Sequence, residues 1–178
     1  MIGRYKYSKT EIDKILNSMV ILVDTREHEG KNDHILNFFD SKNIQYKKLK
    51  LDQGDYSFYL PKDDELCIFR DTYFDKEIIV ERKNSLEEIS GNMANERSRI
   101  KTELALAPPH KILLIENGSY KDIATGNYKT QYDKKSFLGS IHSLWHEFEL
   151  PVVFMPDNNL TGLFIVNYFR YYLGGLIK

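Results

Sequence analysis

The stretch IIVERKNSLEE, residues 78–88, decides the fold, because a short apolar run passes into charged residues and then into the start of a helix. Residues two apart in a strand share a face, so Glu81 and Lys83 point to one side and the intervening arginine to the other. Ser85 followed three residues later by Glu88 is typical of a helix N-cap with a capping box. The stretch therefore predicts a strand that ends in charges and leads directly into a helix.

Apolar runs on both sides of this stretch extend the same alternation of strands and helices, which predicts an α/β fold with a mixed central sheet flanked by helices. We expect residues 44–51 and 55–60 to form a hairpin, with Gly54 supplying a positive φ at the turn. The expected strands are residues 20–23, 44–51, 55–60, 77–83, 111–116 and 151–155. The expected helices are residues 10–19, 33–42, 85–107, 134–149 and 159–173.

Length and composition favour one ordinary globular domain over residues 1–178, since no linker, repeat or low-complexity tract divides the chain. The 25 basic and 26 acidic residues nearly balance, which neither supports nor excludes a local phosphate-binding face. The single cysteine excludes an internal disulfide and a cysteine-ligated zinc site. No signal peptide or membrane span is expected, so we predict an intracellular, cytoplasmic protein.

Three carboxylates stand at predicted strand ends: Asp24, Asp55 and Glu81. Because ligands of open α/β sheets collect at the carboxyl ends of the strands, we expect these side chains to converge. Carboxylates packed together repel one another unless a cation lies between them, and oxygen ligands without His or Cys favour Mg²⁺, with Mn²⁺ as its substitute. With Lys83 within reach of a metal-bound water, the pattern indicates phosphodiester hydrolysis.

Basic side chains that could contact DNA follow the same stretch. At about 100° per residue, a helix over 85–107 would place Arg97 on its apolar stripe, either in a buried salt bridge, as a snorkelling side chain, or reaching an anion. Simple solvated surface is the alternative for each of the others. The candidates for DNA contact are Arg97, Arg99, Lys101, Lys134 and Lys135, with Lys47 and Lys48 as a further pair, and His28 could touch the substrate.

Three motifs, in this order, resemble the nuclease domain of the XPF-type structure-specific endonucleases, a branch of the PD-(D/E)XK superfamily. They are Val23-Asp24-Thr25-Arg26-Glu27, Gly54-Asp55 and Val80-Glu81-Arg82-Lys83. The resemblance spans a motif core of about residues 19–107 and implies a restriction-endonuclease-like fold. By this likeness Asp24, Asp55 and Glu81 would bind the metal and Lys83 would be the catalytic lysine. The residues expected to support the site are Arg26, Glu27, Arg82, Glu87 and Arg97.

Two departures from the family pattern bear on function. Glu87 stands where the family has Asp, and no tandem helix-hairpin-helix module follows, so we expect a stand-alone nuclease that would suit a phage or mobile element. The predicted activity is Mg²⁺-dependent cleavage of DNA, in branched or repair and recombination intermediates. A non-cleaving DNA-binding subunit and a restriction or junction-resolving enzyme are the alternatives.

The last predicted helix, 159–173, is apolar on nearly every face, so more than the sheet must cover it. Either the 134–149 helix covers its second face or a second subunit does. The resemblance favours the second option, a homodimer through C-terminal helices over about residues 134–175.

Overall fold

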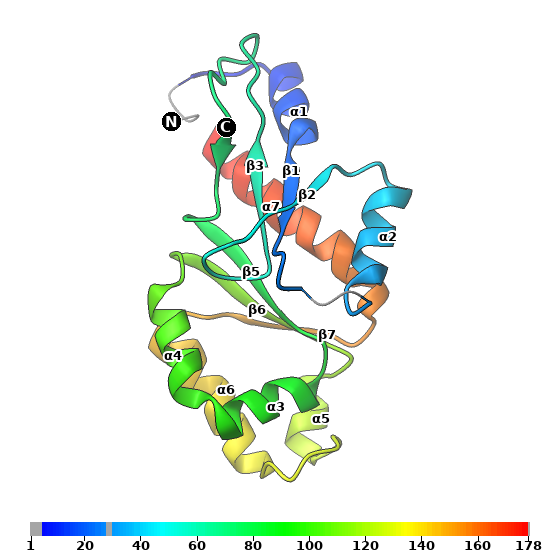
Figure 1. The fold of residues 1–178 in the computed structure, drawn as a ribbon, viewed down its shortest axis with the longest axis vertical. Helices are drawn as coiled ribbons and strands as arrows, with labels where there is room; N and C mark the ends of the chain where they lie inside the picture. The colour runs from blue at the N-terminus through cyan, green and yellow to red at the C-terminus, as the bar shows by residue number, and fades with distance from the viewer. Residues whose placement is uncertain (1–4, 28–29, 178) are drawn as a thin grey trace.

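The computed structural model describes residues 5–27 and 30–177; the predicted substrate contact His28 lies outside this range. Within it, a seven-stranded mixed sheet is flanked by helices (Figure 1), which confirms the predicted fold class. The strands are β1 Val20–Val23, β2 Tyr46–Lys48, β3 Tyr56–Leu60, β4 Thr72–Tyr73, β5 Ile78–Lys83, β6 His110–Glu116 and β7 Val152–Met155. The helices are α1 Lys9–Ser18, α2 Asp33–Ser41, α3 Leu86–Asn95, α4 Arg97–Leu106, α5 Tyr120–Thr125, α6 Lys134–Phe148, the 3-10 helix η2 Asn158–Leu160 and α7 Thr161–Ile177.

The strand order is β2-β1-β3-β5-β6-β7, with β4 paired to β3. The predicted hairpin between residues 44–51 and 55–60 is wrong, because β1 lies between β2 and β3, parallel to the first and antiparallel to the second. The connection leaves the sheet edge at Leu51, which is buried and donates its N–H to Asp24 Oδ2 at 2.9 Å. The chain then crosses to the far side of β1 and re-enters the sheet as β3.

Gly54 is needed where this connection rejoins the sheet. Its φ is +75°, and a Cβ added there would lie 2.8 Å from the Cβ of Ile79. Both the backbone conformation and the close approach exclude a larger residue without rearrangement. The expected positive φ at this position is confirmed.

Two hydrophobic cores lie on opposite faces of the sheet. Inward side chains of β1 and β3, together with Ile78 and Val80 of β5, pack with α1, α2 and α7. Leu113 and Ile115 of β6 instead pack toward α3 and α6, which gather with α4 and α5 in the lower half of Figure 1. Helix α7 is therefore flanked by α1 and α2, so the expected cover by the 134–149 helix is wrong, while cover by a second subunit stays a prediction.

The predicted helix over 85–107 is broken at Glu96, whose φ of −129° and ψ of 21° are not helical. Ser85 caps α3 as expected, its Oγ accepting a hydrogen bond from the Glu88 N–H at 3.3 Å. The break changes the rotational phase of every later residue, so Arg97 is exposed rather than on the apolar stripe. Extrapolating one helical period across a break is the physical reason for the error.

Two short elements, α5 and β4, were not predicted, since neither is long enough to show a hydrophobic period. Among the described residues, no helix has the length and apolar character needed to cross a membrane.

Candidate active site

Backbone hydrogen bonds bring one end of three central strands together. The Asp24 N–H donates to the Asp55 carbonyl at 2.8 Å, and the Asp55 N–H donates to the Val80 carbonyl at 2.9 Å. Because β3 is antiparallel to β1 and β5, its beginning lies beside their ends. Asp55 at the start of β3 therefore meets Glu81 and Lys83 at the end of β5.

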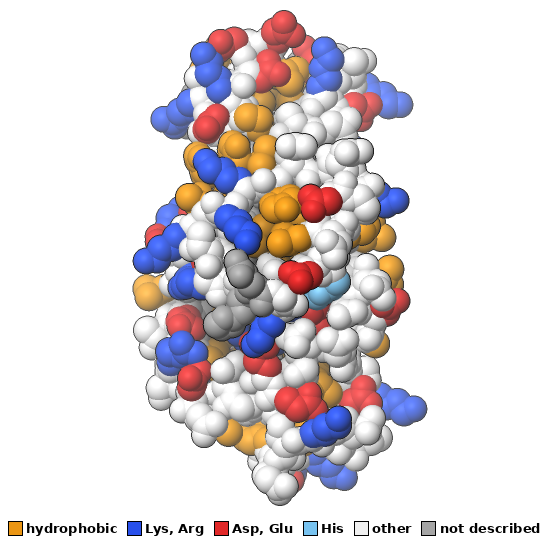
Figure 2. All heavy atoms as spheres, turned by 45° about the vertical axis from the view of Figure 1, so that its right-hand side comes forward, with side chains coloured by type: hydrophobic (Ala, Val, Ile, Leu, Met, Phe, Trp, Pro, Cys, Tyr) orange, Lys and Arg blue, Asp and Glu red, His pale blue; other side chains and the backbone are white. Residues whose placement is uncertain are grey.

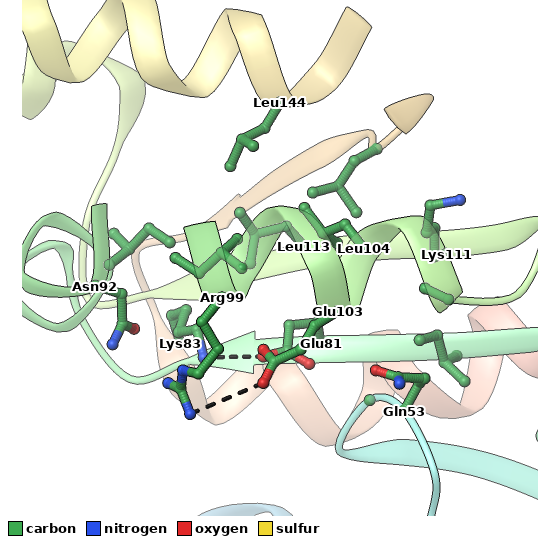
Figure 3. A pocket seen from close by; sticks show the side chains of 16 residues that line it. Gln53, Glu81, Lys83, Asn92, Arg99, Glu103, Leu104, Lys111, Leu113 and Leu144 are labelled. Atoms are coloured by element: carbon green, nitrogen blue, oxygen red, sulfur yellow. Dashed lines mark hydrogen bonds and ion pairs between the residues drawn. The ribbon is translucent and has the colours of Figure 1, made fainter. Parts of the chain in front are cut away.

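A cleft of about 330 Å³ lies over this edge. Figure 3 shows the adjoining pocket, in which Glu81 and Lys83 of β5 lie beside Arg99 of α4, with Gln53 to the right and Leu104, Leu113 and Leu144 above them. The other charged residues that line the cleft are Arg26, Asp52, Asp55 and Glu103. Asp55, Glu81 and Lys83 form the more buried part of the cleft, and the exposed side chains around them are of both signs: Arg26, Asp52, Arg99 and Glu103.

Asp55 and Glu81 repel one another within this cleft. Burial, followed by the charges of Glu81 and Glu27, raises the pKa of Asp55 well above its usual range. Its Oδ2 accepts one hydrogen bond, from the Arg82 N–H at 2.7 Å, which offsets only part of that cost. A site in which burial and a neighbouring carboxylate oppose the ionisation of Asp55 is one that a cation would stabilise.

Lys83 is held between carboxylates. Its Nζ donates to Glu81 Oε1 at 2.9 Å and lies 3.9 Å from Glu88 Oε1. Burial alone would lower the pKa of Lys83, but the Glu81 and Asp55 charges outweigh it and raise that pKa. The side chain is therefore an ammonium ion at neutral pH.

Asp24 differs from the expectation of three converging carboxylates. It is buried, and its two oxygens accept four hydrogen bonds, three from Arg26 at 2.6–2.9 Å and one from the Leu51 N–H at 2.9 Å. Burial would raise the pKa of Asp24, but these donors outweigh it and lower the pKa. In this structure Asp24 thus holds Arg26 and the Leu51 backbone, and its role as a third metal ligand stays a prediction.

A buried ionic network supports the site from the opposite face of β5. Arg82 donates to Glu27 Oε2 at 2.8 Å and to Glu116 Oε2 at 2.7 Å. Glu116, which is fully buried, also lies 2.8 Å from His34 Nε2 through its other oxygen. The predicted supporting residues Glu27 and Arg82 thus meet behind the cleft, where they fix the strand that carries Glu81 and Lys83.

Apart from Arg99, the remaining predicted residues of the described chain do not line the cleft. Glu87 accepts a hydrogen bond from the Lys129 N–H at 2.9 Å, so it is turned to a surface loop and does not line the cleft. Lys101 pairs with Glu147 of α6 at 2.6 Å. Lys134 and Lys135 are exposed in the first turn of α6. Of the cationic helix residues, Arg99 is the one that reaches the cleft, where it pairs with Glu96 and Glu103.

The chemistry of the donor set fits a hard divalent cation, although three ligands do not converge. Among residues 5–27 and 30–177, no three acidic, histidine or cysteine side chains are grouped to hold an ion. Asp55 and Glu81 supply two carboxylates in an open cleft, and the raised pKa of Asp55 marks a deficit of positive charge. Mg²⁺ is commonly held by one or two carboxylates, with water and substrate phosphate completing its shell.

Sequence reasoning missed three functional candidates: Glu88, Glu116 and His34. Glu116 ends the apolar strand 111–116 just as Glu81 ends its own, so the rule used for the other carboxylates could have found it. Glu88 lies in the first turn of α3, and the turn of the chain at the Ser85 cap brings its Oε1 to 3.9 Å from Lys83 Nζ. No sequence signal pairs His34 with Glu116, because the two are 82 residues apart.

Comparison with known proteins supports this fold. The ERCC4 domain family matches residues 23–168. XPF from Aeropyrum pernix is similar to 86% of this chain with 18% identity and a TM-score of 0.58, and its complex with DNA to 86% with 19% identity and a TM-score of 0.60. The chain spans 61% and 64% of those two chains. A comparison with curated proteins gives no match.

Proposed function

This chain belongs to the ERCC4 domain family, and from that premise we propose that it is a metal-dependent endonuclease that hydrolyses phosphodiester bonds in DNA. The observation that carries the proposal is the joint placement of Asp55, Glu81 and Lys83 in one cleft rimmed by arginines. XPF from Aeropyrum pernix, whose fold this chain shares, has been solved in complex with DNA. We propose that the substrate class is branched DNA, or intermediates of repair and recombination.

Asp55 and Glu81 would hold Mg²⁺, or Mn²⁺ in its place. When bound, the ion would supply charge stabilisation at the attacked phosphate and a water of lowered pKa. Neutralising two carboxylates that now repel each other would itself stabilise the folded chain.

Lys83 would act as a charged donor, because its Nζ lies in the cleft and donates to Glu81 Oε1 at 2.9 Å. From its position beside Glu81 it can orient a water or stabilise negative charge that develops on the phosphate. Arg26 and Arg99, at the rim of the cleft, are placed to contact phosphates on either side of the scissile bond. The Asp24 carboxylate positions Arg26 for that contact.

The decisive experiment incubates the purified chain with flap, fork, junction, single-stranded and linear duplex DNA, with Mg²⁺, with Mn²⁺ and with EDTA. We expect metal-dependent nicking that Asp55→Asn, Glu81→Gln and Lys83→Met each reduce more than about 100-fold. Glu65→Gln, at an exposed carboxylate outside the cleft, is the matched control and should keep full activity.

Each other outcome has a definite reading. Binding of DNA without nicking at any metal concentration would favour a non-cleaving subunit. Cleavage confined to four-way junctions or to one duplex sequence would favour a resolving or restriction enzyme. Nicking that survives both Asp55→Asn and Glu81→Gln would refute the assignment of the site.

We also propose that the chain forms a homodimer through α7. On this helix Leu163, Tyr171 and Leu176 are 46%, 79% and 39% exposed, and a groove of about 640 Å³ runs beside it between α1 and α2. Figure 2, in which the side of the molecule that carries α2 comes forward, shows hydrophobic side chains gathered near mid-height. Sedimentation equilibrium should give a dimer that Leu163→Glu with Tyr171→Asp converts to monomer; a monomeric parent chain would refute this.

A further inference from the structure

A cation and two aromatic rings are stacked on the sheet face opposite α7. The Nζ of Lys47 lies 5.8 Å from the ring centroid of Tyr59, and the Tyr59 and Tyr73 rings stack with centroids 4.9 Å apart at 13°. Lys47 is exposed and Tyr73 is 40% exposed. We call Lys47, Tyr59 and Tyr73 the aromatic platform.

The register of three strands builds this platform. Tyr59 of β3 is directly opposite Tyr73 of β4, and Val20 of β1, on its other side, leaves room for Lys47 to reach across from β2. Neighbours of Tyr59 along β3 point to the α7 core, so Tyr59 itself points to the other face. A cross-strand aromatic pair alone would stabilise the short β4, but that role requires neither the lysine nor the exposed ring surface.

The platform lies on the same face as the cleft. Asp55 and Tyr59 are four residues apart in one extended segment, so their side chains share a face and are separated by roughly 13 Å at ~3.3 Å per residue. That distance equals the rise of about four stacked nucleotides at ~3.4 Å each. Lys50 is exposed on the connection that leads from β2 toward the cleft.

We propose that the aromatic platform binds an unpaired strand of the DNA substrate, with a base stacking on Tyr73 and Lys47 contacting the phosphate backbone. In a duplex the faces of the bases are covered by their neighbours, so an exposed ring beside a cation selects unpaired nucleotides. The inference rests on the proposed nuclease function and deepens it, since it names the single-stranded arm of a branched substrate as the part that this surface recognises.

The test measures binding without cleavage. Fluorescence anisotropy in EDTA would compare a labelled 20-nucleotide oligo(dT) with a 20-base-pair duplex. We expect Tyr73→Ala to weaken oligo(dT) binding about 5- to 100-fold and to leave duplex binding unchanged, while Tyr73→Phe, which keeps the ring, binds as the parent does. Lys47→Ala should reduce the salt dependence of oligo(dT) binding by a slope of about 0.7.

Tyr120→Ala is the matched control, because Tyr120 is 46% exposed on α5, outside the platform. As a second readout, an oligo(dT) carrying 5-iododeoxyuridine should photocrosslink to the peptide that contains Tyr73. This measurement uses the parent chain and therefore does not depend on the folding of a variant. Equal oligo(dT) affinity for Tyr73→Ala and the parent, or equal losses for Tyr73→Ala and Tyr120→Ala, would overturn the platform. Absence of nicking with Tyr73-dependent binding intact would overturn the proposed activity alone.

Discussion

Removing the Arg82 guanidinium should be among the most destabilising single changes in this chain. Arg82→Met keeps most of the side-chain length but leaves Glu116, fully buried, and Glu27, whose side chain is 8% exposed, without their shared cation. Breaking a buried pair by removing one partner costs about 3–5 kcal/mol, because the other charge stays buried. Two carboxylates lose their partner here, so we expect a loss within that range.

This loss is large against a total stability of about 5–15 kcal/mol. For a chain of this length it corresponds to a fall in Tm of roughly 6–20 °C. With an m-value of about 2 kcal/mol/M, the urea midpoint should fall by roughly 1.5–2.5 M. Urea unfolding followed by circular dichroism at neutral pH, without divalent metal, measures it.

Two further variants separate the buried network from charge loss in general. Arg99→Met removes an arginine that is 61% exposed in its ion pairs, and should cost less than about 1 kcal/mol. Arg82→Met combined with Glu116→Gln should recover part of the loss, since one buried charge disappears with the cation. An Arg82→Met cost no larger than that of Arg99→Met would refute the reasoning.

Three other changes have outcomes fixed by the structure. Gly54→Ala should lower Tm by several degrees, because φ is +75° and the new Cβ meets Ile79; an unchanged melting curve would contradict the strain. Asp24→Asn should lower the free energy of unfolding by about 1.5–3 kcal/mol at pH 7. Because the folded-state pKa of Asp24 is lowered, the difference in stability between variant and parent should shrink as pH falls below about 4. A constant difference from pH 7 to pH 3 would contradict the stabilising role of the Asp24 carboxylate. Ser85→Ala should cost about 1 kcal/mol through the lost cap on the Glu88 N–H, and a loss below 0.2 kcal/mol, taken as roughly the error of urea unfolding, would contradict the cap.

Most strands of the fold could be predicted because they contain a short apolar run with a charged or turn residue at its end; the two-residue β4 has no such run. The order of the strands could not be predicted, since β1 is inserted between β2 and β3 by long-range pairing that leaves no local mark. The break at Glu96 escaped because no glycine or proline stands within residues 92–100 to mark it.

The sequence was a better guide to the cleft than to its surroundings. Asp55, Glu81 and Lys83 meet there because strand ends and pleat alternation are nearly geometric rules. The hydrogen bonding of Asp24 could not be predicted, because the Arg26 guanidinium folds back onto both of its oxygens and residue spacing alone does not reveal such a contact. The inward direction expected of Arg97 failed because it depended on an unbroken helix.

The two oppositely facing cores have one more consequence. β6 contributes side chains to both cores, and β5, whose end carries Glu81 and Lys83, pairs with β6 along its whole length. If either core opens, β6 loses the side-chain packing on one of its faces, and the end of β5 beside it no longer holds the shape of the cleft. Hydrogen exchange should therefore find the β5 amides among the slowest in the molecule. A partly unfolded chain would then no longer form the cleft.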